Sequence, residues 1–478
     1  MDTTTAQKFC DQIWNDSIVP QLVDYIKIPN KSPHFDPDWE QHGYMEDAVQ
    51  QISRWCQQQP IPGLQLEIIR LPGRTPLIFM DIPGTDQPAG TSATEDCILL
   101  YGHLDKQPEM SGWADGLGPW QPVLKDDKLY GRGGADDGYA AFASLTALMA
   151  VQAQQLPHAR CVVIIEACEE SGSYDLPFYI DHLQARIGKP SLVICLDSGA
   201  GNYQQLWSTV SLRGLAAGTL RVEILREGVH SGYASGIVPS SFRIARQLLE
   251  RLEDSASGQL RPDWLHCPIP AQRRQQTEQV AELLGDEVYR AMPWLAGAQP
   301  MADDPVELLL NRNWRPTLSV TGVEGIPPLA NAGNVLRPYT AFKLSLRLPP
   351  LVDGEQAKAQ LKTLLEADPP YGAKVSFEGS EGATGWNAPA LAPWLERSLN
   401  TASQAVYGAP ALHMGEGGTI PFMGMLGEKF PDAQFMITGV LGPQSNAHGP
   451  NEFLHIPYAR KLTTCVAQVI TDHYQRQD

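Results

Sequence analysis

Short apolar segments alternate with helix-like segments along the first two hundred or so residues. The runs at 98–101, 162–165 and 191–196 are rich in β-branched and other apolar residues, as expected for strands that are buried on both faces of a sheet. Residues 140–155 and 176–187 carry apolar side chains at spacings of three and four, which predicts helices. The alternation predicts an α/β domain with a mostly parallel sheet and helices on both faces.

The pattern changes after residue 207. Strand-like segments at 215–225, 316–323, 341–348 and 374–377 now enclose helical patterns at 240–252 and 355–366. This order predicts an inserted α+β domain of the β-α-β-β-α-β, ferredoxin-like type. A polar, proline-rich segment at 260–315 interrupts it, and the first pattern returns near residue 390. We therefore expect one domain formed by residues 1–209 and 383–478, with residues 210–382 inserted as a second domain.

Length and charge narrow the class of protein. The 478 residues exceed what one ordinary hydrophobic core supports, which agrees with two domains. The formal net charge of -18 argues against nucleic acid as a partner, because nucleic-acid binding depends on basic patches. The chain lacks a membrane-length apolar run and a signal-peptide pattern, and its eight cysteines show no CxxC spacing. These features predict a cytoplasmic protein with reduced thiols and no membrane partner.

Acidic and histidine side chains gather where the predicted strands end. They are His103, Asp105, Asp136, Asp137, Glu169, Glu170, Asp197 and His448. The carboxyl edge of an open α/β sheet is where ligands bind. So many carboxylates in one place would repel one another unless cations lay among them. Each residue alone has an ordinary explanation, such as a turn or a helix cap, but their common position predicts a pair of metal ions.

The residue types indicate which metal and which reaction. Imidazole and carboxylate ligands without thiolate favour zinc in a catalytic site, with manganese or cobalt as alternatives. Two such ions lower the pKa of a water and polarise a carbonyl, and a further carboxylate is then needed as general base. The adjacent Glu169 and Glu170 can divide the roles of base and ligand between them. The stretch therefore predicts a metal-dependent hydrolase.

Seven motifs occur in an order that resembles a known family. They are Gly102-His103-Leu104-Asp105, the Tyr-Gly-Arg-Gly-Gly-Ala-Asp-Asp run at 130–137, Glu169-Glu170-Ser171-Gly172-Ser173, Asp197, the Gly-Val-His-Ser-Gly run at 228–232, the Gly-Glu-Gly-Gly-Thr-Ile-Pro run at 415–421, and Ala447-His448. The chain resembles the aminoacylase and carnosinase-type zinc metallopeptidases, which are dinuclear exopeptidases and include cytosolic nonspecific dipeptidases. The resemblance spans nearly the whole chain.

The resemblance implies specific roles at the metal site. His103 and Asp197 would bind one zinc ion, Glu170 and His448 the other, and Asp136 would bridge the two. Glu169 would be the general base, and Asp105 would orient His103. The family also has a cis peptide bond after its bridging aspartate, so we expect Asp136-Asp137 to be cis.

The resemblance also implies a substrate site and a homodimer. Residues 210–382 would be a lid and dimerisation domain, from which His230 reaches the partner subunit's site to stabilise the tetrahedral intermediate. Asn334 would be offered across the dimer in the same way. Arg347 would hold the substrate carboxylate, with Gly418 and Thr419 contributing.

These expectations combine into a zinc exopeptidase that hydrolyses dipeptides or short peptides through a hydroxide bridging two zinc ions. An N-acyl-amino-acid deacylase of the same family shares every metal and base residue and is the main alternative; a non-catalytic metal-binding scaffold is the other. Two positions depart from related dipeptidases, which have Lys where this chain has Gly138 and Arg where it has Gly415. The departures bear on substrate preference and leave the hydrolytic residues intact.

Overall fold

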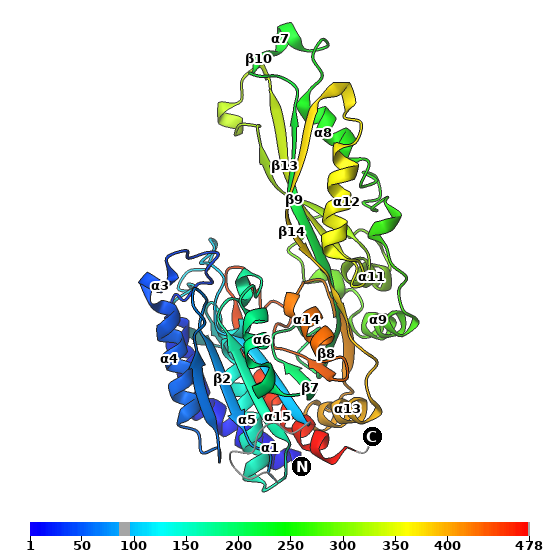
Figure 1. Ribbon diagram of the computed structural model, residues 1–478. Helices are drawn as coiled ribbons and strands as arrows, with labels where there is room; N and C mark the ends of the chain where they lie inside the picture. Colours follow the sequence, from blue (N-terminus) through cyan, green and yellow to red (C-terminus); the bar gives the residue numbers. More distant parts are fainter. Residues whose placement is uncertain (86–95, 477–478) are drawn as a thin grey trace. The chain divides into compact units, whose positions relative to one another are not determined.

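The computed structural model describes residues 1–85 and 96–476. The chain forms two compact units (Figure 1). Unit 1 contains Met1–Thr209, Ala388–Met414 and Met425–Asp478, and unit 2 contains Val210–Asn387 and Gly415–Gly424. The sequence at 83–96 is rich in turn-forming residues and predicts a polar turn, and most of it falls outside the described residues. None of the described helices is both long and apolar enough to cross a membrane.

Unit 1 is built on a six-stranded sheet. Its strand order is β1 (Gln65–Ile69), β2 (Leu77–Ile82), β6 (Arg160–Glu166), β3 (Cys97–His103), β7 (Pro190–Cys195) and β17 (Gln434–Ile437). The four strands from β6 to β17 are parallel, whereas β1 and β2 pair antiparallel at one edge. The predicted α/β class with a mostly parallel sheet is confirmed. β3 and β6 are buried along their whole length, which explains why their sequences are continuously apolar.

Helices of unit 1 cover this sheet. They include α1 (Thr3–Ile13), α2 (Val19–Ile26), α4 (Tyr44–Gln57), α5 (Ala140–Ala153), α6 (Leu176–Ile187), α13 (Pro393–Tyr407) and α15 (Ile456–Gln475). α5 contacts β3 and β6 on one side and α15 on the other, so it is apolar all round instead of amphipathic. A smaller sheet pairs β4 (Val123–Lys125), β5 (Lys128–Tyr130) and β18 (Phe453–His455). The pairing of β5 with β18 brings the segment after residue 130 close to the loop before residue 453.

Unit 2 is an α+β unit with a four-stranded antiparallel sheet. The strand order is β11 (Thr317–Glu324), β13 (Tyr339–Leu348), β9 (Gly214–Glu223) and β14 (Lys374–Ala383). α8 (Ser241–Leu249) and α12 (Gly354–Glu366) lie along one face of the sheet, as Figure 1 shows. The core between them includes Leu220, Ile244, Leu344, Leu361 and Phe377. The predicted β-α-β-β-α-β order is therefore confirmed.

The segment 260–315 contains helices that the pattern analysis did not predict. They are α9 (Ala271–Leu284), α10 (Glu287–Arg290) and α11 (Pro305–Asn313). α9 is mostly polar and buries few apolar side chains, so it lacks a clear hydrophobic stripe. α11 begins with local signals instead, because Asp304 accepts a hydrogen bond from the Val306 N–H and Pro305 occupies the first turn.

Candidate active site

The predicted site residues of unit 1 meet at one edge of the large sheet. β3 ends at His103, which lies opposite Glu166 at the end of β6. The chain leaving β6 carries Glu169 and Glu170, and the chain leaving β7 carries Asp197. Because β3 lies between β6 and β7, these residues follow three neighbouring parallel strands. The topology thus gathers them at the carboxyl edge.

Asp136 lies between two imidazoles. Its Oδ1 atom is 3.2 Å from Nε2 of His103, and its Oδ2 atom is 3.0 Å from Nε2 of His448. The same His448 nitrogen is 3.3 Å from Oε2 of Glu170. This carboxylate therefore lies between the two imidazoles, with one oxygen toward each.

The carboxylates of Asp197 and Glu169 lie on another side of His103. Oδ2 of Asp197 is 3.8 Å and Oε2 of Glu169 is 4.0 Å from Nε2 of His103. Two sets of ligand atoms lie close enough to hold an ion, namely those of His103, Asp136 and Glu170 and those of His103, Glu169 and Asp197.

Asp105 fixes the orientation of its neighbours. Its carboxylate accepts hydrogen bonds from the N–H groups of Glu169 (3.1 Å) and Glu170 (3.0 Å). Its Oδ1 atom is also 3.4 Å from Nδ1 of His103, and its carbonyl oxygen is 3.2 Å from that nitrogen. A proton on Nδ1 satisfies these acceptors and leaves Nε2 of His103 as the ligand atom.

The peptide bond Asp136-Asp137 is cis, which confirms the expectation from the family. Oδ2 of Asp137 accepts a hydrogen bond from the His103 N–H at 3.3 Å, so this second aspartate supports the strand end. The next residue, Gly138, has no room for a side chain, since a Cβ there would lie 2.2 Å from the Tyr25 ring. The absence of a Lys at this position therefore has a local packing cause.

The electrostatics of the cluster fit divalent cations. Burial, reinforced by the negative charge of Asp197, raises the pKa of Glu169 well above its usual value. Burial and the charge of Asp136 do the same to the pKa of Glu170, and burial raises the pKa of Asp197 to about 6. Burial opposes the charged form of His103, yet hydrogen bonds to Asp105 and Asp136 raise its pKa. Buried carboxylates outnumber the imidazoles, so the cluster lacks positive charge, and its N and O donors suit zinc.

Three further residues support the cluster and were not singled out by the sequence. The Gln107 amide donates a hydrogen bond to Oε2 of Glu170 at 2.6 Å. Arg132 and Glu452 form an ion pair with both side chains almost fully buried. Glu452 also accepts from the Gly133 N–H at 2.8 Å, and Arg132 donates to the carbonyl of Gly449 at 2.9 Å. The pair thus joins the Asp136 segment to the loop that carries His448.

The predicted substrate-binding residues of unit 2 form two groups. In one, Nη1 of Arg347 donates to the Thr419 hydroxyl at 3.0 Å, and that hydroxyl donates to the carbonyl of Arg213 at 2.7 Å. The Gly418 carbonyl accepts from the Arg213 N–H at 3.1 Å. Arg213 was missed, although a lone arginine between apolar strand residues is an unusual pattern that could have marked it.

The other group contains His230 and Asn334. β10 (Val229–His230) pairs with β12 (Val335–Leu336), and the Asn334 carbonyl accepts from the Ser231 N–H at 2.9 Å. Both His230 and Asn334 are exposed. β12 comes just before the end of β13 that begins at Tyr339. Arg347 lies near the other end of β13, about 26 Å from Tyr339 at the usual rise per residue of a strand. Within one chain, His230 is therefore not beside Arg347.

A family model described as Peptidase family M20/M25/M40 matches residues 99–472. The chain belongs to this peptidase family. The match confirms the family that the motifs indicated and identifies the protein as a metallopeptidase-type hydrolase.

Relatives and solved structures agree with this assignment. A cysteinylglycine-S-conjugate dipeptidase of Corynebacterium striatum is 26% identical and is matched over 90% of this chain and 92% of its own length. A Cys-Gly metallodipeptidase of Saccharomyces cerevisiae is 26% identical, over 85% of this chain and 86% of its own. The structure of human carnosine dipeptidase 1 has a TM-score of 0.75 at 21% identity and covers 99% of this chain and 100% of its own. The peptidase family members thus share the fold.

Proposed function

We propose that this protein is a dinuclear zinc dipeptidase with Glu169 as its general base. The observation that carries the proposal is the position of Asp136, which presents one oxygen to His103 and the other to His448. The named relatives, which are dipeptidases, favour this substrate class over N-acyl amino acids. We also propose that residues 1–209 and 383–478 act as the catalytic domain and residues 210–382 as a lid and dimerisation domain.

The contacts around Asp136 support the ligand assignment that the family resemblance implies. One zinc ion would be held by His103 and Asp197, the other by Glu170 and His448, with Asp136 shared between them. Zinc ions at these positions supply Lewis acidity, which lowers the pKa of a water and polarises the scissile carbonyl. Gln107 and Asp105 hold Glu170 and His103 in place through the hydrogen bonds described above.

Glu169 is placed to move the proton. Its N–H is fixed by Asp105, and its carboxylate lies at the edge of the ligand cluster, 4.0 Å from His103. Burial raises the pKa of this carboxyl group, which strengthens it as a proton acceptor. The carboxylate takes a proton from the attacking water and returns it to the leaving amine.

Arg347 would bind the free carboxylate of the dipeptide. Its guanidinium is held through Nη1 by Thr419, which leaves its other nitrogens for a bidentate contact. Gly418 has open space where a side chain would stand. Apart from its chain neighbours, no atom of the described residues lies within 4 Å of the position that a Cβ atom would take. This space gives a substrate close access to the backbone beside Thr419.

His230 would act in the partner subunit's site of a homodimer. It lies far from Arg347 within unit 2. Large apolar side chains that follow it in the sequence are exposed, with Tyr233 81% exposed and Ile237 79% exposed. Leu329, near Asn334 in the chain, is 94% exposed. Large exposed apolar side chains of this kind mark protein interfaces.

The test combines substrates, metal content and one variant. We expect the zinc-loaded protein to cleave free dipeptides and to leave the matching N-acetyl amino acids intact. Glu169→Gln should keep the zinc content of the wild type while kcat falls by about 10²–10⁴, the usual contribution of a general base. Cleavage of only the acylated substrates would move the protein to the deacylases. Loss of zinc in Glu169→Gln would show that the roles of Glu169 and Glu170 are reversed.

A further inference from the structure

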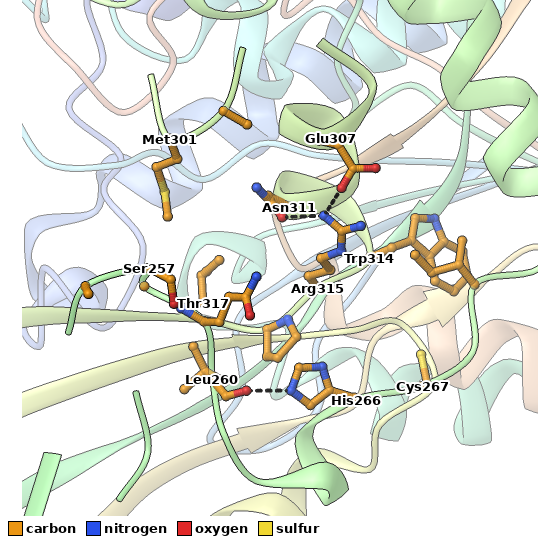
Figure 2. Close-up of a pocket in the computed structure, with 16 residues that line it drawn as sticks. Ser257, Leu260, His266, Cys267, Met301, Glu307, Asn311, Trp314, Arg315 and Thr317 are labelled. Carbon is orange, nitrogen blue, oxygen red and sulfur yellow. Dashed lines mark hydrogen bonds and ion pairs between the residues drawn. The ribbon is translucent and has the colours of Figure 1, made fainter. Parts of the chain in front are cut away.

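The segment 260–315 and the residues that flank it line a cavity of about 790 Å³ within unit 2 (Figure 2). Its apolar lining includes Leu260, Ile269, Met301 and Trp314, and its charged lining consists of Glu307 and Arg315. This volume is typical of sites that bind small molecules. The wall combines these apolar side chains with polar ones, which also include Ser257, His266 and Asn311.

Arg315 is held on one side only. Its Nη1 atom contacts Oε2 of Glu307 at 2.7 Å and donates to Oδ1 of Asn311 at 2.8 Å, and Figure 2 shows both contacts. Across residues 1–85 and 96–476, its Nε and Nη2 atoms have no hydrogen-bond partner. An oriented guanidinium with two free donors is the group that binds a carboxylate bidentately.

Glu307 offers the complementary charge. Its Oε2 atom contacts Arg315, whereas among the residues that the structure describes the nearest cationic group to Oε1 is Nη1 of Arg274, at 3.9 Å. The cavity therefore presents a cation and an anion side by side, with an acceptor oxygen and two donors still available. A ligand that is neutral overall but carries both charges on neighbouring atoms matches this pair better than a simple anion.

We propose that this cavity binds a free α-amino acid with an apolar side chain. The carboxylate would contact Arg315, the ammonium group Glu307, and the side chain the wall formed by Leu260, Ile269 and Met301. Such amino acids are products of dipeptide hydrolysis, so the choice of ligand rests on the proposed function. The cavity is then a second product site, separate from the group around Arg347.

Hydrogen bonds link this cavity to Arg347. Nη1 of Arg213 donates to the carbonyl of Asn311 at 3.4 Å and to the Thr317 hydroxyl at 3.0 Å, and both residues line the cavity. The carbonyl of Arg213 in turn holds the Thr419 hydroxyl, which holds Arg347. Because Asn311 also holds Arg315, a bound amino acid contacts the same network that positions Arg347. Occupancy is therefore expected to change KM for the dipeptide.

Isothermal titration of the zinc-loaded full chain with leucine tests the site without relying on turnover. Arg315→Gln should raise the Kd for leucine about tenfold or more, because it removes charge-assisted hydrogen bonds. Leucinamide and N-acetyl-leucine, which each lack one charge, should bind the wild type more weakly than leucine. Glu307→Gln should also weaken leucine binding, and it removes no cation, so it serves as a second variant if Arg315→Gln unfolds. Arg290→Gln removes an exposed arginine elsewhere in unit 2 and should change nothing.

The competing site is Arg347, where a product amino acid would also bind. Leucine binding that survives in Arg347→Gln and disappears in Arg315→Gln supports the cavity. Binding that disappears in Arg347→Gln and survives in Arg315→Gln overturns it. In the kinetics, leucine should change KM at least twofold more in the wild type than in Arg315→Gln, where only competition at Arg347 is left, and an equal effect in both would overturn the link to Arg347. Leucine binding through Arg315 in a protein that cleaves no dipeptide would refute the proposed function alone.

Discussion

At the scale of single residues, the hydroxyl of Thr419 decides how Arg347 is oriented. A hydroxyl has one proton, and Thr419 donates it to the carbonyl of Arg213, so the oxygen is left to accept from Arg347. Thr419 therefore cannot also donate to a substrate carboxylate in this arrangement. Its contribution to the carboxylate site, which the family resemblance implies, would then be to position the arginine.

Thr419→Val should accordingly raise KM about tenfold with a smaller change in kcat. The lost hydrogen bond to the Arg347 guanidinium is worth about 1.5–3 kcal/mol, and relaxation of the site recovers part of this free energy. Steady-state kinetics on one dipeptide measures both constants. Thr419→Ser keeps the hydroxyl and is the matched control, expected near the wild-type KM. A wild-type KM in the valine variant would show that Arg347 needs no such support.

At the scale of elements, the ion pair of Arg132 and Glu452 sets the distance between two loops that come from distant parts of the chain. A buried pair adds little to stability by itself, but removing one partner costs about 3–5 kcal/mol because the other charge stays buried. His448 depends on its loop for its position, because its side chain is 53% exposed and its φ of 64° lies in the left-handed region.

Glu452→Gln should therefore lower the zinc content from about two ions per chain toward one, because His448 loses its place beside Asp136. Metal analysis after dialysis gives the stoichiometry. Arg160→Gln breaks another buried arginine contact, to Asp81 between β6 and β2, and should lower stability without loss of zinc. Equal zinc loss in both variants would mean that any destabilisation of unit 1 releases the metal.

α15 ends in a second buried contact, which makes stability depend on pH. Burial, with a further contribution from the positive charge of Arg476, lowers the pKa of His473 to about 4, and its Nε2 atom is 2.7 Å from the Ser191 hydroxyl. The folded state thus keeps this imidazole neutral, whereas the unfolded chain protonates it near pH 6.5. Its contribution to stability is complete above pH 6.5 and is lost as the pH falls to about 4.

His473→Gln should remove that dependence. Between pH 7 and pH 4.5, the free energy of unfolding should fall by about 2 kcal/mol more in the wild type than in the variant, as the linkage relation requires for one proton over this range. Urea unfolding curves at the two pH values give the change in the free energy of unfolding for each protein. The protonation of other groups contributes equally to both proteins and cancels in the comparison. The same pH dependence of stability in both proteins would show that His473 has the same pKa in the folded and unfolded states.

The elements also show what the sequence could predict. Strands β3 and β6 are fully buried and β7 nearly so, and acidic or histidine residues lie at or just after their ends, so their pattern predicts both the sheet and its ligand edge. α9 was missed because its apolar positions are few, and α11 because it is short and lies in a segment that is polar as a whole. Arg132, Glu452 and Gln107 were missed for a similar reason, since they act through partners far away in sequence and no local spacing reveals such contacts.

At the scale of the whole molecule, the position of His230 makes the proposed dimer testable. The variants Glu169→Gln and His230→Ala should each be inactive alone. After joint refolding, a mixed dimer contains one subunit with an intact base and a partner that offers an intact His230. An equal mixture should therefore regain about a quarter of wild-type activity, since half of the dimers are mixed and each has one complete site. A mixture that stays inactive would place His230 in its own chain's site, and full activity of His230→Ala alone would place it outside any site.

The order of the ligands along the chain has a consequence for synthesis. His448 follows β17, the last strand of the large sheet, whereas His103 ends β3. A chain emerging from the ribosome exposes most of the carboxylates long before the second imidazole is made. The growing polypeptide would therefore lack the second set of proposed metal ligands until residue 448 has been made, and peptidase activity would begin only after that point.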